Sequence, residues 1–311
     1  MASAPWSLQT RLLFLLMVVF WGLNYPFVNV GLTQAGPLWL ATLRAAVGAA
    51  ATLPIVSAFG GWGSLDGADR RFAILLGVPN TALFFGLWFW AARTVLPGIA
   101  AVVIYTFPLL VALLSPVVLG HRLGARHWAS VGVGFVGIAL ISQIGESGGS
   151  AVSLPAILLL LGAAVSWAFG TVVFQRRFRR EQLVEASAYQ LVGGTVALLV
   201  ATLLFAPTPL PHVNADLVAS LAWMGVLGTA AAYAIWFTLL GRTRAATLSA
   251  YVFLVPVVAL AASVLLFGER LSILQVGGVA LVLVSIYGIG RARWEESPPP
   301  GPARVPGSPG T

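Results

Sequence analysis

Residues 97–123 read PGIAAVVIYTFPLLVALLSPVVLGHRL, and residues 245–271 repeat this stretch as AATLSAYVFLVPVVALAASVLLFGERL, 148 positions later. The match continues upstream, first with the same offset and then with an offset of 146. The paired residues include Pro108 and Pro256, Gly120 and Gly268, Trp88 and Trp236, Trp21 and Trp167, and Arg44 and Gln190. A repeat of this length predicts one structural half that is built twice.

The composition places the chain among membrane proteins. Hydrophobic residues form 59% of the 311 residues and charged residues only 8%, whereas soluble domains carry about 25% charged residues. The net charge of +8 does not indicate a nucleic-acid surface, because the basic residues are all arginines spread between apolar runs. The absence of cysteine excludes disulfides, thiolate metal ligands and a cysteine nucleophile.

The apolar runs are long enough to cross a bilayer, which takes about 20 residues per helix. Ten such runs lie at about 12–32, 37–58, 72–92, 97–118, 128–144, 154–175, 184–206, 216–240, 245–267 and 272–290. Because each half holds five spans, an odd number, the second half enters the membrane from the opposite side. We therefore predict an all-α integral membrane protein with ten transmembrane helices, arranged as two inverted five-helix repeats.

The repeat and the arginines predict the division of the chain and its orientation. We expect a short N-terminal segment, two five-helix repeats and a disordered proline-rich tail, at residues 1–11, 12–146, 147–296 and 297–311. With the N-terminus in the cytoplasm, fourteen of the 17 arginines fall on the cytoplasmic side, and only Arg93 and Arg270 fall outside. Cytoplasmic loops collect arginine, so we predict that both termini are cytoplasmic.

Polar and aromatic residues interrupt the first span. Trp21, Asn24 and Tyr25 precede Pro26, which leaves the carbonyl of Gly22 without its helical partner. A helix that faces lipid does not tolerate such groups. Either Pro26 only bends a packed helix, or these residues line a cavity, as interrupted helices do in transporters built from repeats.

Arg44 lies inside the second span, where a charged side chain costs at least about 2.5 kcal/mol on insertion scales. It must therefore face protein or water. Two roles stay open: binding of a substrate's anionic group, or a structural contact with carbonyls of neighbouring broken helices. Its counterpart Gln190 is polar but uncharged, so the two halves differ chemically at this place.

Pro108 and Pro256 predict a matched kink in the two halves, which is either a hinge or a fixed bend. With Pro26 they are the candidate hinge residues. The candidate substrate-binding residues are Trp21, Asn24, Tyr25, Arg44, Asn80, Trp88, Tyr105, Trp167, Tyr189, Gln190, Tyr233, Trp236 and Tyr251. Trp90 is instead expected to face lipid.

These stretches resemble the drug/metabolite transporter superfamily and, within it, the EamA-type ten-helix transporters. The resemblance covers about residues 12–290 and is carried by FWGLNYPFVNVGL with Trp21, LRAAVGA with Arg44, SWAFGTVV with Trp167, and VFLVPVVALAASVLLFGERLS with Pro256 and Glu269. It implies a protein of the inner membrane that transports amino acids or other small metabolites through a central cavity between the halves, by alternating access. His121 departs from the family pattern, which has an acid in the first copy.

We expect a secondary transporter that exports a small, amino-acid-like metabolite, with the substrate and the lipid bilayer as partners and neither nucleic acid nor a cofactor. A membrane enzyme acting on lipid or prenyl substrates is one alternative, and a non-transporting scaffold or sensor is another. The enzyme would need acid–base or metal-binding groups within the membrane, but all nine acids and three histidines lie in loops, at helix ends or in the tail. The chain lacks a GxxxxGK loop, which excludes a self-powered pump.

Small residues concentrate in the spans at 128–144 and 272–290. Such faces permit close contact between helices. The contact lies either within the chain or in a homodimer, and the sequence does not decide between them.

Overall fold

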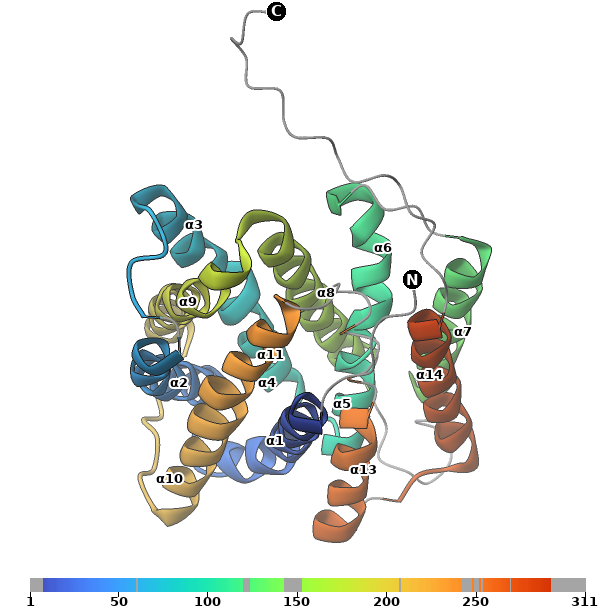
Figure 1. Cartoon of the computed structure of the whole chain (residues 1–311). Coiled ribbons are helices and arrows are strands. Elements are labelled where there is room, and N and C mark those ends of the chain that lie inside the picture. Colours follow the sequence, from blue (N-terminus) through green and yellow to red (C-terminus); the bar gives the residue numbers. More distant parts are fainter. Residues whose placement is uncertain are drawn as a thin grey trace, which may run out of the picture.

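A computed structural model describes residues 8–59, 61–119, 124–142, 153–206, 208–241, 248, 252, 254–268 and 270–291. Regular structure in these residues is helical throughout (Figure 1). The first half contains α1 (Leu8–Leu32), α2 (Pro37–Phe59), α3 (Gly67–Gly77), η1 (Val78–Leu83), α4 (Phe84–Ala91), α5 (Pro97–Ile104), α6 (Phe107–Leu119) and α7 (Ala125–Ser142). The second contains α8 (Leu154–Arg177), η2 (Arg180–Gln182), α9 (Leu183–Phe205), α10 (Ala215–Leu221), η3 (Ala222–Ala231), α11 (Ala232–Leu240), α13 (Leu254–Phe267) and α14 (Ile273–Arg291).

These helices confirm the predicted membrane architecture. Within the described residues, seven helical stretches are long and apolar enough to cross a bilayer, and three shorter apolar helices lie at Trp128–Gly137, Leu254–Phe267 and Val276–Ser285. Each of the ten lies within a predicted span or overlaps most of it.

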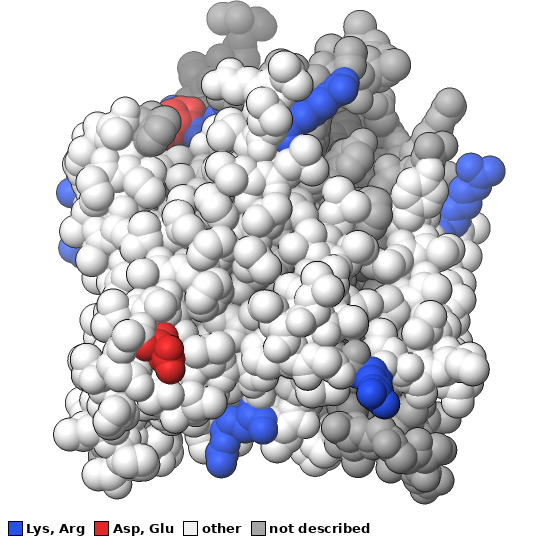
Figure 2. Space-filling view, turned by 90° about the horizontal axis from the view of Figure 1, so that it is seen from below, with Lys and Arg blue, Asp and Glu red and all other residues white. Residues whose placement is uncertain are grey.

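The outward surface is apolar, as a bilayer solvent requires. Leu204 and Phe205 of α9, Leu265 of α13 and Ile273 of α14 are 69%, 76%, 82% and 91% exposed. Figure 2, which views the molecule from below, shows a mostly uncharged face with a few separate charged side chains. The protein is therefore a multi-pass membrane protein whose apolar exterior faces lipid.

Helices of the two halves pack with exchanged partners. α2 packs along its counterpart α9, and α7 along its counterpart α14. α1 packs against α13, while α8, the counterpart of α1, packs against α6, the counterpart of α13. This exchange relates the halves by an approximate twofold, which is the arrangement of an inverted repeat.

The spans that contain Pro108 and Pro256 are both broken just before the proline. α5 ends at Ile104 and α6 begins at Phe107, and in the second half Val252 lies in a turn and α13 begins at Leu254. A proline removes a helical hydrogen bond in the preceding turn, so the breaks lie where the sequence predicts matched kinks. α1, by contrast, continues through Pro26 as one helix. The hinge role of the three prolines stays a prediction.

Two π-helical segments, η1 and η3, occupy matching places in the third span of each half. Beside each, glycines bring two helices close together: a Cβ on Gly77 would overlap backbone atoms of Gln190 and Gly194, and one on Gly225 would overlap Val47. In η3 the Thr229 hydroxyl donates to the carbonyl of Met224, five residues earlier, at 2.8 Å. π-Segments of this kind are frequent at functional sites.

The small residues of α7 and α14 pack against each other at the right of Figure 1. A Cβ on Gly137 would meet the Gly278 carbonyl, and one on Gly134 would meet Ser285. The Ser285 hydroxyl donates to the Ser130 carbonyl at 2.5 Å. These small faces are therefore used within the chain, and the homodimer stays a prediction.

Candidate functional site

A central cavity lies between the two halves. Its empty volume is about 350 Å³, and the surrounding side chains leave free room for about one water-sized molecule. The lining residues are Trp21, Asn24, Tyr25, Arg44, Phe84, Trp88, Ile104, Tyr105, Phe107, Trp167 and Tyr233. Nine of the eleven come from the first half, and α8 and α11 of the second half supply Trp167 and Tyr233. The cavity is thus unequal in composition although the fold is nearly symmetric.

Aromatic rings form most of its wall. Tyr25 lies 4.7 Å from Trp88, centroid to centroid, and Trp167 lies 5.2 Å from Tyr233. The repeat counterparts Trp21 and Trp167 meet edge to face, at 5.9 Å and 90°. Ring pairs favour such tilted and edge-on geometry. The wall therefore offers apolar surface, ring faces and a few polar tips to a bound molecule.

Arg44 is the charged residue of this cavity, and it is only 1% exposed. Its Nε donates to the Thr229 hydroxyl at 3.1 Å. Its guanidinium carbon lies 4.2 Å from the centre of the Phe85 ring and 4.9 Å from that of Trp88, so cation–π contacts stabilise the charge. Nη1 is buried and has no hydrogen-bond partner among the described residues. Among the described residues, no carboxylate lies within ion-pair distance of Arg44.

Gln190 occupies the matching place in the second half, and its polar atoms are satisfied. Its Oε1 accepts from Asn80 Nδ2 at 2.8 Å, and its Nε2 donates to the Thr81 hydroxyl at 3.1 Å. Thr81 and Thr229 are repeat counterparts, so Arg44 and Gln190 make equivalent hydrogen bonds. The charge and the unpartnered N–H distinguish the arginine.

Two asparagines of the first half pack on glycines of the second. Asn24 Nδ2 donates to the Gly228 carbonyl at 3.4 Å, and a Cβ on Gly228 would overlap the Asn24 amide. A Cβ on Gly170 would likewise overlap the Asn80 amide. In the repeat, Asn24 corresponds to Gly170 and Asn80 corresponds to Gly228. Each asparagine therefore contacts the glycine that is the repeat counterpart of the other asparagine.

The structure brings most of the predicted residues to one place. Eight of the thirteen line the cavity: Trp21, Asn24, Tyr25, Arg44, Trp88, Tyr105, Trp167 and Tyr233. Trp236 lies behind this wall, 5.3 Å from Trp21 between ring centres. Tyr251 lies outside the described residues.

Three predicted residues lie away from the cavity lining. Asn80 and Gln190 hydrogen-bond to each other behind it. Tyr189 meets Trp62 edge to face, with 5.9 Å between ring centres, beside the loop before α3. It points away from its neighbour Gln190, because adjacent residues on a helix are about 100° apart around the axis. The prediction missed Phe84, Ile104 and Phe107. Phe84 lies one turn before Trp88, and Phe107 lies directly before Pro108. These two spacings were the features of the sequence that could have indicated Phe84 and Phe107 as lining residues.

A polar network joins the two halves near the start of α9. Glu185 is 2% exposed and accepts from the amides of Gly63, Ser64 and Leu65, at 3.2, 2.7 and 3.3 Å, and from the Ser64 hydroxyl at 2.6 Å. Gly63 has a φ of 101°, which a glycine adopts readily. The glycine thus lets the loop turn its amides toward the carboxylate.

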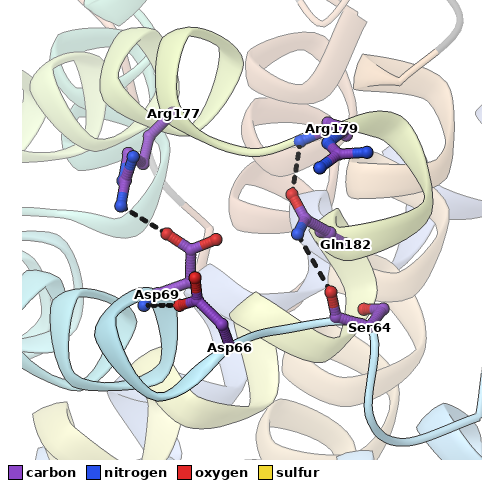
Figure 3. A network of polar contacts seen from close by, with 6 residues as sticks. All are labelled: Ser64, Asp66, Asp69, Arg177, Arg179 and Gln182. Atoms are coloured by element: carbon purple, nitrogen blue, oxygen red, sulfur yellow. Dashed lines mark hydrogen bonds and ion pairs between the residues drawn. The ribbon is translucent and has the colours of Figure 1, made fainter.

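Figure 3 shows the neighbouring contacts of the same network. Gln182 donates to the Ser64 carbonyl at 3.0 Å and accepts from the Arg179 amide at 2.9 Å. Arg177 pairs with Asp69 at 2.5 Å. Together with Glu185 these contacts fasten the loop between α2 and α3 to the turn between α8 and α9.

Comparison with known proteins agrees with this architecture. A model of the EamA-like transporter family matches residues 9–143 and 154–291, once in each half. The chain belongs to the EamA-like transporter family. It is therefore a membrane transporter rather than an enzyme. A solved crystal structure with 20% sequence identity covers 90% of this chain and 96% of its own, with a TM-score of 0.65, and shows the same fold.

Curated relatives extend along nearly the whole transporter. It is 28% identical to the "Uncharacterized transporter YvbV" of Bacillus subtilis, covering 89% of this chain and 90% of that protein. It is 28% identical to a "Probable amino-acid metabolite efflux pump" of Escherichia coli, with coverages of 94% and 98%. A "Probable terminal-alkyne amino-acid exporter" of Streptantibioticus cattleyicolor is also 28% identical, with coverages of 97% and 99%.

Proposed function

We propose that this transporter is a secondary carrier that exports a small, amino-acid-like metabolite across the cytoplasmic membrane, by alternating access around the central cavity. The observation that carries the proposal is the cavity itself. It lies between two inverted halves, is walled by aromatic rings and contains a buried arginine. Substrate sites of repeat transporters lie at such interfaces between repeats.

The names of two relatives support the direction and the substrate class. One is named as an efflux pump for amino-acid metabolites and another as an exporter of an amino acid. We extend these names to the present chain as part of the proposal.

The small free volume supports alternating access. A metabolite of amino-acid size is larger than the space left between the side chains, so the cavity must widen before it admits one. The breaks before Pro108 and Leu254 lie on matched helices next to the cavity and suit a concerted movement of the halves. We assign Pro26, Pro108 and Pro256 to this movement as hinge residues.

A transport experiment tests the proposal. Proteoliposomes are loaded with a bacterial metabolite extract, and the compounds that leave are identified by mass spectrometry. We expect selective, saturable efflux of small amino-acid-like compounds, with none from protein-free liposomes. Equal leakage from both preparations would overturn the proposal.

The orientation is part of the same proposal and has its own test. Reporter fusions after Arg180 and at the C-terminus should report a cytoplasmic location, and a fusion after Ala206 an external one. An external C-terminus would contradict the proposed orientation.

A further inference from the structure

We infer that Arg44 recognises a single carboxylate group and that the transporter therefore takes monocarboxylate substrates with an apolar or aromatic remainder. This inference rests on the proposed function and specifies the chemistry of its site.

The first step is the unused hydrogen-bonding capacity of the arginine. Burial of a cation in a membrane span is unfavourable unless protein or ligand groups compensate the charge. The Thr229 hydroxyl accepts a hydrogen bond from Nε, and the rings of Phe85 and Trp88 lie beside the guanidinium. Nη1, however, is buried and finds no partner in the part of the chain that the structure describes. The arginine thus retains a charged donor on a residue that lines the cavity.

The second step is the comparison with Gln190, which serves as an internal control. The same fold position in the other half carries a side chain whose donor and acceptor are both used within the protein. A neutral amide side chain is therefore enough to pack and hydrogen-bond at this position of the fold. The positive charge of Arg44, and its Nη1 group that has no partner within the described residues, exceed what packing requires, which points to a ligand.

The third step is the character of the surrounding groups. Among the described residues, three more polar atoms of the lining are buried without a hydrogen-bond partner: Trp88 Nε1, the Tyr233 hydroxyl and Asn24 Oδ1. The first two add donors to that of the arginine, and Asn24 Oδ1 adds an acceptor. A ligand that satisfies the donors must present acceptor oxygens, and carboxylates match the planar guanidinium well.

The fourth step separates a carboxylate from a phosphate. The chain has no lysine, and Arg44 is the only cationic side chain among the described lining residues. One cation matches the single charge of a carboxylate, whereas a phosphate monoester carries about two charges at neutral pH. The aromatic wall then takes the apolar remainder of the substrate.

The test uses matched ligands that differ only in the charged group. Thermal unfolding of the purified full-length protein is followed with L-leucine, L-leucinamide, L-phenylalanine and L-phenylalaninamide. We expect each amino acid to stabilise the wild type at a concentration at least about tenfold lower than its amide. A hydrogen bond to a charged group is stronger than a neutral one by about 1.4 kcal/mol, which corresponds to a tenfold difference in affinity.

Arg44→Gln, which introduces the residue found at the matching place, should reduce this preference to less than about twofold. Arg44→Lys should give an intermediate preference, because lysine retains the charge and loses the planar fork. Arg93→Gln is the control, since Arg93 is exposed and lies outside the cavity. It should leave the preference unchanged, and Arg44→Lys keeps the test usable if Arg44→Gln fails to fold.

Several results would overturn the inference. They are equal stabilisation by amino acid and amide, no stabilisation by either, or an unchanged preference in a folded Arg44→Gln. Efflux from extract-loaded liposomes of compounds that all lack a carboxylate would overturn it while leaving the proposed transport intact. Absence of any selective efflux would instead overturn the proposed function.

Discussion

Replacing Gly170 with alanine should destabilise the transporter by disturbing one helix crossing between the halves. Gly170 of α8 faces Asn80 of η1, and an added Cβ would overlap the Asn80 amide. Asn80 is held by its hydrogen bond to Gln190 at 2.8 Å. One turn before Gly170, the Ser166 hydroxyl donates to the Pro79 carbonyl and fixes the same two helices. The side chain and the backbone therefore have little freedom to move apart.

The size of the effect follows from these contacts. Displacing Asn80 leaves the buried Gln190 Oε1 unpaired, which costs about 1–3 kcal/mol. The extra methyl group adds about 1–3 kcal/mol of overpacking. The higher helix propensity of alanine returns about 1 kcal/mol. The net loss of stability is therefore about 1–5 kcal/mol.

Thermal unfolding in detergent measures the loss, and Gly132→Ala is the control. Gly132 lies in α7, and a Cβ there would meet nothing within 4 Å, so this variant should be neutral or slightly stabilised. In an Asn80→Ala background, the penalty of Gly170→Ala should nearly disappear, because the overlapping amide is gone. Equal melting temperatures for the two glycine variants, or a penalty that persists without Asn80, would refute the steric argument.

Three further predictions concern the cavity, the polar network and energy coupling. Trp21→Ala and Trp167→Ala should reduce flux several-fold more than Trp90→Ala at equal expression, because Trp90 is 43% exposed and outside the cavity; equal losses in a flux assay would mean that packing had been mistaken for binding. Glu185→Gln should increase trypsin cleavage at Arg70 and Arg71 at least about tenfold, because the loop amides that lose their partner cost about 1–3 kcal/mol. Glu181→Gln is the control and should leave cleavage unchanged, since Glu181 only forms an exposed ion pair of 4.0 Å with Arg179. An equal increase in both variants would contradict the role of the buried carboxylate. Proteoliposomes without an ion gradient should show counterflow of substrate, because the predicted spans hold no carboxylate in their interior; accumulation that requires a pH gradient and disappears in Glu269→Gln would disprove this expectation.

The repeat explains why so much of the fold could be predicted. Ten apolar runs and an offset that changes by only two residues define two halves, and an odd number of spans sets their relation. The counterparts Arg44 and Gln190 could be paired from the sequence alone. Their equivalent bonds to Thr229 and Thr81 could not, because these depend on how the helices cross.

Local backbone geometry limited the prediction elsewhere. Pro79 marks the π-segment of the first half, but no proline marks η3, where glycines permit close approach and Thr229 bonds back to Met224. The sequence placed Glu185 only among the acids in loops, at helix ends or in the tail. Its burial depends on a loop that folds over it with Gly63 at positive φ, a contact 122 residues away in the sequence. Apolar periodicity contains no information on such distant polar contacts.

The two asparagine–glycine contacts between the halves, Asn24 with Gly228 and Asn80 with Gly170, affect how such a carrier can be assembled. If the halves were made as separate chains, two first halves facing each other would place Asn24 against Asn80 and crowd two amides into the room for one. Two second halves would set Gly170 against Gly228 and leave a void. Only a mixed pair fills both crossings, so separately produced halves should form heterodimers and reject self-pairing. Within one chain, therefore, neither half can replace the other at these two helix crossings.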